Sequence, residues 1–171
     1  MKPLSSFKRG VAEVRHDLEH GKYERALARV AKLLQDWPDN PQLLVMWADL
    51  IQLQESDEGP SLDDARAALQ RASELEGPSP AALIELGAYY YAVDDDPAAA
   101  NKTFDKAIRL CKRLLIDAIL GRAKALGDLE RSQEAFACLA QAYALQNQNG
   151  HVPGADTAEI LEQLKGLSRA Q

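Results

Sequence analysis

The chain has 171 residues, of which 46% are hydrophobic and 6% aromatic, and its formal net charge is −6. This length suits one domain or one short repeat array, and many alanines with few aromatic residues favour packed helices over a sheet. Residues 41–100 carry 12 acidic and 2 basic side chains, which makes nucleic acid an unlikely partner.

The N-terminal sequence MKPLSSFKRG lacks the apolar segment of a signal peptide, and no apolar run approaches the length of a membrane span. The two cysteines, Cys111 and Cys138, have no metal-binding or redox spacing, and both fall on expected apolar helix faces. We therefore predict buried free thiols, no cofactor and a cytoplasmic protein without membrane insertion.

The first predicted helix pair spans residues 7–40, and its apolar stripe starts at Val11 and Val14. Glu13 and Asp17 occupy positions that are usually apolar in such a pair. We expect this pair to present a polar face to solvent, as the end of a repeat array must.

The second and third pairs, residues 41–78 and 79–111, both begin with a capping residue followed by proline. In the third pair, we predict that Tyr90 belongs to the core and that the second helix starts at Asp96-Pro97. The expected apolar face of this second helix consists of Ala100, Phe104, Ala107, Ile108 and Cys111.

The fourth pair spans residues 112–146, and we predict a loop at 147–155 and a capping helix at 156–168. No proline or glycine separates Cys111 from Gly121, so the third and fourth pairs are joined by a nearly continuous helix or by a sharp bend. The period of the array follows from alanines that are 39, 35 and 35 residues apart, namely Ala26, Ala65, Ala100 and Ala135.

The third pair carries the most regular motif. It reads Leu83-x2-Leu86-Gly87-x2-Tyr90, followed by Ala100-x3-Phe104-x2-Ala107. This pattern resembles the tetratricopeptide repeat, with leucine in place of the usual tryptophan. The resemblance implies an all-α, right-handed superhelix of about four helical hairpins over residues 1–171. It also implies a non-catalytic scaffold that binds a peptide segment of another protein in a concave groove.

By that resemblance, the first helices of successive hairpins line the groove. The predicted lining residues are Arg15, Val45, Asp49, Gln52, Leu53, Ile84, Ala88, Tyr91, Ala118 and Arg122. Asp49 and Arg122 suit a peptide that carries both charges. Tyr91 is either an anchor for an apolar side chain of the ligand or a core residue.

A basic stripe is expected on the second helix of the third pair, formed by Lys102, Lys106, Arg109 and Arg113. We interpret it as a solvated face, or alternatively as a second surface for an acidic partner, a nucleic-acid backbone or an anionic membrane.

The segment from His16 to His20 matches the H-x-x-E-H signature of some zinc proteases. Two histidines four residues apart share a helix face and can bind one metal ion. These histidines point away from the apolar stripe, where no cleft is expected, so we interpret them as solvated and predict no metal site.

Three other functions stay open. The first is a small chaperone of the same repeat type for a secreted or unassembled client. The second is a structural subunit that self-associates through the basic stripe and the acidic middle of the chain. The third is a metal-dependent hydrolase at His16, Glu19 and His20. The sequence makes no prediction of oligomeric state.

Overall fold

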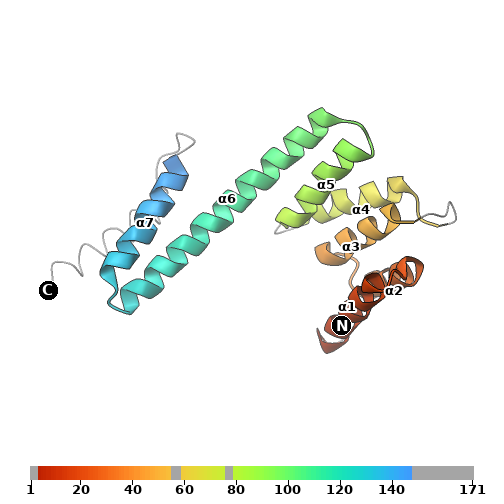
Figure 1. Cartoon of the computed structure of the whole chain (residues 1–171), viewed down its shortest axis with the longest axis horizontal. Helices are drawn as coiled ribbons and strands as arrows, with labels where there is room; N and C mark the ends of the chain where they lie inside the picture. Colours follow the sequence, from red (N-terminus) through yellow and green to blue (C-terminus); the bar gives the residue numbers. More distant parts are fainter. Residues whose placement is uncertain (1–3, 55–58, 76–78, 148–171) are drawn as a thin grey trace. The chain divides into compact units, whose positions relative to one another are not determined.

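The computed structural model describes residues 4–54, 59–75 and 79–147, and this part of the chain contains seven α-helices and no strand (Figure 1). The helices are α1 (Leu4–Glu19), α2 (Tyr23–Asp36), α3 (Pro41–Gln52), α4 (Leu62–Glu74), α5 (Pro80–Ala92), α6 (Pro97–Asp128) and α7 (Ser132–Asn147). The all-α prediction is confirmed for these residues. The predicted capping helix at 156–168, and the predicted loop beyond Asn147, lie outside them.

The chain divides into two compact units, Met1–Ile108 and Arg109–Gln171. The division falls inside α6, close to the expected junction of the third and fourth pairs. α6 is one helix from Pro97 to Asp128, so the continuous connection forms and the sharp bend does not. No proline or glycine interrupts the chain between Pro97 and Gly121, which leaves the helical hydrogen bonds unbroken there.

Side-chain caps start several helices where the sequence predicts them. Asn40 Oδ1 accepts the backbone N–H of Leu43 at 3.1 Å, directly before α3. Asp96 Oδ1 accepts the N–H groups of Ala98 and Ala99 at 3.1 and 2.9 Å, which starts α6. These oxygens satisfy N–H groups that have no partner within the helix.

The starts of α4 and α5 differ in their capping. Ser61 and Asp64 form a reciprocal capping box at the start of α4. Ser79 precedes Pro80, but its side chain accepts no capping hydrogen bond, so the predicted serine cap of α5 is wrong. α5 still starts at Pro80, because the proline ring fixes a helical φ angle and has no N–H to satisfy.

The first unit is a succession of packed helices. Each helix from α1 to α4 contacts the next one, and α3 also contacts α5. One apolar core runs through them, and its largest fully buried side chains are Tyr89, Leu43, Leu50, Leu69, Val14 and Val30. The alanines that set the repeat period are all buried in the structure, at Ala26, Ala65, Ala100 and Ala135.

A glycine allows α5 and α6 to approach closely. A Cβ atom placed on Gly87 would lie 2.8 Å from the ring of Phe104, well inside van der Waals contact. Gly87 therefore leaves the space on α5 that the Phe104 ring of α6 occupies.

The predicted apolar face of α6 is wrong at two positions. Ile108 is 63% exposed and Cys111 is also exposed, whereas Cys138 is buried as expected. The buried stripe instead follows steps of three and four through Ala100, Thr103, Ala107 and Leu110. Thr103 fits this stripe because its hydroxyl donates to the Ala99 carbonyl at 2.8 Å.

The second unit has its own core, formed by the later part of α6 and by α7. The buried residues of α6 are Ile116, Ile119, Leu120, Ala123 and Leu126, and those of α7 are Ala135, Cys138, Leu139 and Ala142. Alternating large and small side chains let the two helices pack as a hairpin.

The predicted polar face of α1 is wrong at Asp17, which is buried. Asp17 Oδ2 lies 2.6 Å from Arg29 Nε and 3.5 Å from Arg25 Nε, both on α2. Arg29 also pairs with Glu13 of α1. The contact between Asp17 and Arg29 is an ion pair without hydrogen-bond geometry. This cluster of charges, rather than a solvated face, joins α1 to α2.

Candidate protein-binding surface

The predicted groove residues of α3 and α5 form two helical stripes on helices that contact each other. On α3, Val45 and Asp49 are partly buried, whereas Gln52 is exposed. On α5, Ile84 is 43% and Tyr91 68% exposed. Leu53 at the end of α3 and Ala88 of α5 are also exposed. We call these side chains together the α3–α5 surface.

The three consecutive tyrosines of α5 have three different environments. Tyr91 is exposed, so the alternative that places it in the core is wrong. Tyr90 is half-buried against the core, and its hydroxyl oxygen accepts a hydrogen bond from Gln70 Nε2 at 3.1 Å. Tyr89 is the fully buried one.

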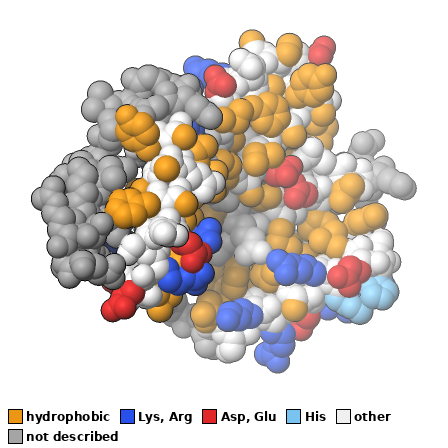
Figure 2. Space-filling model, turned by 60° about the vertical axis from the view of Figure 1, so that its left-hand side comes forward, with side chains coloured by type: hydrophobic (Ala, Val, Ile, Leu, Met, Phe, Trp, Pro, Cys, Tyr) orange, Lys and Arg blue, Asp and Glu red, His pale blue; other side chains and the backbone are white. Residues whose placement is uncertain are grey.

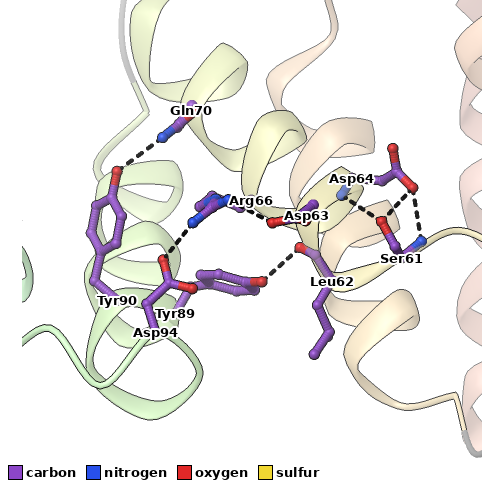
Figure 3. A network of polar contacts seen from close by, with 9 residues as sticks. All are labelled: Ser61, Leu62, Asp63, Asp64, Arg66, Gln70, Tyr89, Tyr90 and Asp94. Carbon is purple, nitrogen blue, oxygen red and sulfur yellow. Dashed lines mark hydrogen bonds and ion pairs between the residues drawn. The ribbon is translucent and has the colours of Figure 1, made fainter.

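Tyr89 belongs to a polar network that fixes α5 against α4 (Figure 3). Its hydroxyl donates to the Leu62 carbonyl oxygen at 2.6 Å. Arg66 joins Asp63 of its own helix, at 2.5 Å, to Asp94 just beyond α5, at 3.2 Å. Burial, together with the Asp94 charge, raises the pKa of Tyr89 above its usual value. The network holds the exposed side of α5 in place.

Two carboxylates take part in the α3–α5 surface, Asp49 of α3 and Glu85 of α5, and from here on the surface includes Glu85. Burial raises the pKa of Asp49 from its usual 3.8 to about 6, and the neighbouring Glu85 charge adds to this rise. No described residue forms an ion pair with Asp49. The surface therefore combines exposed apolar side chains with an uncompensated acidic pair.

Replacing Asp49 with asparagine should raise the free energy of unfolding by about 1 kcal/mol near pH 7.5, a value discounted for partial solvent screening. The folded-state pKa of about 6 lies above the ordinary value of 3.8, so the folded protein binds the proton more tightly. The stability of the wild type relative to the variant therefore falls as the pH rises between these values.

Urea unfolding near pH 7.5 and near pH 4 measures this difference. At the lower pH the benefit of the substitution should largely vanish. Glu74→Gln, at an exposed carboxylate of α4, is the matched control and should change stability little at either pH. An equal effect of Asp49→Asn at both pH values would contradict the prediction.

The other predicted groove residues are exposed but belong to other helices. Arg15 lies on α1, which contacts α2 among the helices of the first unit. Ala118 and Arg122 lie on the part of α6 that belongs to the second unit. The acidic residue whose charge acts on Asp49 is Glu85, which the sequence did not single out.

The basic stripe of α6 is exposed along its whole length, at Lys102, Lys106, Arg109 and Arg113. This exposure suits both a solvated face and a second docking surface. Its role in binding stays a prediction.

A cavity of about 1080 Å³ lies between the start of α2 and the end of α3. Tyr23, Trp47 and Leu53 contribute apolar surface to its lining, and Gln54 also lines it. Trp47 Nε1 and Gln54 Oε1 are buried and have no hydrogen-bond partner among the described residues. Of these residues, only Leu53 was among the predicted groove residues, because a cavity between two helices and a loop depends on tertiary packing.

One group of side chains in the described part of the chain can hold a metal ion. His16, Glu19 and His20 are exposed, and one ligand atom of each lies within 4.8 Å of the others. Figure 2 shows the described histidines, in pale blue, together on the molecular surface. Their predicted solvent exposure is confirmed.

Across residues 4–54, 59–75 and 79–147, no helix is both long enough and apolar enough to cross a membrane. No protein-family model matches the chain, and no curated protein shows significant similarity to it.

Proposed function

We propose that this protein is a non-catalytic scaffold of the tetratricopeptide type, whose helical hairpins form a right-handed superhelix and bind a segment of a partner protein. The packing of successive helices supports this proposal, as does the contact between α3 and α5, the first helices of neighbouring hairpins. The buried alanines at the repeat period and the close approach at Gly87 also support it.

The observation that carries the proposal is the acidic pair Asp49 and Glu85 on the α3–α5 surface. The Glu85 charge makes ionisation of Asp49 less favourable, and Asp49 has no cation beside it among the described residues. A lysine or arginine from a partner would supply that cation, and a charge-assisted hydrogen bond of this kind is among the stronger polar contacts. The pair is therefore suited to a basic side chain.

The apolar side chains of the same surface define the rest of the ligand. Ile84 and Tyr91 are exposed on α5, and tyrosine is among the residues that most often dominate binding energy at protein interfaces. The proposed partner segment therefore carries a basic residue with apolar neighbours. A client of a small chaperone could present the same segment, so the chaperone role is a special case of this proposal.

Fluorescence anisotropy with labelled synthetic peptides tests the proposal. The probe peptides have a central arginine flanked by leucine and tyrosine, and the reference peptides have glutamate in place of the arginine. Wild-type protein should prefer the arginine peptides. Because a hydrogen bond to a charged group contributes about 1.5–3 kcal/mol, Asp49→Asn should weaken their binding by about tenfold or more. Glu85→Gln should also weaken it.

Matched controls separate the surface from general effects of substitution. Tyr91→Ala should weaken binding, whereas Tyr143→Ala, at an exposed tyrosine of α7, should not. Glu74→Gln should leave affinity unchanged. Equal affinity of wild type and the Asp49 and Tyr91 variants for these peptides would reject the α3–α5 surface.

Light scattering at low and high salt distinguishes a self-associating structural subunit from a peptide-binding scaffold. Its acidic middle would pair with the basic stripe of another copy, so its oligomers should dissociate as salt screens the charges. A salt-sensitive oligomer that binds no arginine peptide would favour that function over the scaffold.

A further inference from the structure

The exposed cluster at the end of α1 consists of His16, Glu19 and His20. The first and last are four residues apart and Glu19 is three from His16, so the three side chains leave one side of a single helical turn. The two imidazole rings have centroids 4.2 Å apart and are tilted by 46°. The cluster thus holds two nitrogen ligands and one carboxylate before any ion binds.

The hydrogen bond of His20 prepares one ring nitrogen for a metal ion. His20 Nδ1 lies 2.7 Å from the carbonyl oxygen of His16. A carbonyl only accepts, so Nδ1 carries the proton and donates it. The lone pair is then on Nε2, the ring nitrogen that takes no part in the hydrogen bond to the His16 carbonyl. Metal-bound histidines commonly donate their other ring N–H to a backbone carbonyl in this way, which fixes the tautomer and the ring orientation.

The distances within the cluster suit a small transition-metal ion after minor side-chain rotation. Ligands about 2.1 Å from a tetrahedral ion are about 3.4 Å apart, so groups now within 4.8 Å of one another must close by no more than about 1.4 Å. All three side chains are exposed, so this rotation disturbs no buried packing. Imidazole nitrogen favours zinc, copper and nickel, whereas magnesium and calcium favour oxygen ligands.

We propose that His16, Glu19 and His20 form a surface site for a divalent transition-metal ion of the zinc, nickel and copper class. Water completes the coordination sphere, because the site is open. The ion bridges the last turn of α1, where His16 and Glu19 lie, to His20, the first residue beyond it. The negative end of the helix dipole further favours a cation at this position.

A bound ion restrains the turn between α1 and α2. There Gly21 has a φ angle of 67°, and the Lys22 N–H reaches back to the Asp17 carbonyl at 2.9 Å. An ion that ties His16 to His20 restrains the end of the helix just before this turn. An ion that binds the folded protein and not the unfolded chain raises the free energy of unfolding. Once its concentration exceeds Kd, the rise is proportional to the logarithm of that concentration.

Calorimetric titration of the tag-free full-length protein with zinc, nickel or magnesium salts tests the site. The Cys111→Ser background removes the exposed thiol, which would compete for zinc. We expect one zinc or nickel ion per chain, no binding of magnesium, and a higher unfolding temperature with zinc. Each of His16→Gln and His20→Gln should weaken zinc binding by at least about tenfold. Removal of a residue that only hydrogen-bonds to a metal ligand already costs about that much, and these two residues are ligands themselves.

The third histidine supplies the matched control. His151 lies outside the described residues, and His151→Gln should leave the zinc affinity unchanged. Circular dichroism confirms that each variant is folded, as expected for exposed positions. Zinc binding that survives in the His16→Gln, His20→Gln double variant, or that disappears in His151→Gln, would overturn the proposal. Equal binding of magnesium and zinc would overturn it as well.

Discussion

Replacing Arg29 with methionine is expected to lower the free energy of unfolding by about 3 kcal/mol, because it leaves the Asp17 carboxylate buried without its closest counter-charge. The side chain of Asp17 is only 3% exposed, and Arg29 Nε lies 2.6 Å from it. Arg25 lies farther away, at 3.5 Å, and is itself mostly exposed, so it compensates the lost charge only in part.

Removing the acid of this ion pair should lower the free energy of unfolding by less. Asp17→Asn keeps the size of the side chain and leaves Arg29 without its acid, but the Arg29 side chain is 31% exposed and still pairs with Glu13. A charge that reaches water pays little desolvation penalty, so we expect a loss of about 1–2 kcal/mol.

A double-mutant cycle on urea unfolding measures the coupling between the two groups. The combined Asp17→Asn, Arg29→Met variant removes both charges, and it should therefore be less destabilised than the sum of the single variants by about 1–3 kcal/mol. Strict additivity, or a larger cost for Asp17→Asn than for Arg29→Met, would show that the pair is not the buried contact that the structure describes.

Asp17 also shows where prediction from sequence reaches its limit. Its position on the apolar side of α1 was visible in the helical spacing, but a charged residue there normally indicates a solvated face. Its partner Arg29 is 12 residues away on another helix, and no local pattern connects the two. The burial of Asp17 follows only from the packing of α1 on α2.

Helix boundaries were predictable because they depend on local chemistry. Asn40 and Ser61 cap their helices with their own side chains, and Pro41 can stand only near a helix start. The continuous α6 follows from the absence of proline and glycine over more than 20 residues, although the sequence alone left a bend as an alternative.

Which face of a helix is buried was harder to predict. In α6 the apolar pattern fits two neighbouring stripes, and the structure buries the one with Thr103 while exposing Ile108. In α5 the spacing pointed to Tyr90 as the core tyrosine, but Tyr89 is the buried one. A rotation of about 100° separates adjacent residues of a helix, so small differences in packing decide between them.

The candidate binding surface was predictable only in outline. Ile84 and Ala88 are exposed, as the groove prediction requires. Tyr91 is exposed as well, rather than part of the core. The acidic pair was not predicted, since Glu85 is 36 residues from Asp49 and its charge acts on Asp49 only because α3 contacts α5. A charge arrangement of this kind depends on tertiary structure.

Replacing Tyr89 with alanine is expected to destabilise the protein by about 3–5 kcal/mol, the largest effect that we expect of any single substitution. The ring is one of the largest fully buried side chains of the first core, and its loss leaves a cavity where α5 packs on α4. The hydroxyl contributes separately, because it donates to the Leu62 carbonyl at 2.6 Å (Figure 3).

The variant Tyr89→Phe separates these two contributions. It keeps the ring and removes only the hydrogen bond, so it should cost about 1 kcal/mol. Tyr91→Ala, two residues away on the exposed side of the same helix, is the control for helix propensity and should change stability by less than about 1 kcal/mol. Thermal and urea unfolding of the three variants measure the difference. Tyr89→Ala and Tyr91→Ala losing equal stability would mean that Tyr89 does not anchor α5 to α4. The expected result, a stable Tyr91→Ala beside a weakened Tyr89→Ala, would leave Tyr91 free to be tested for binding without a change in fold.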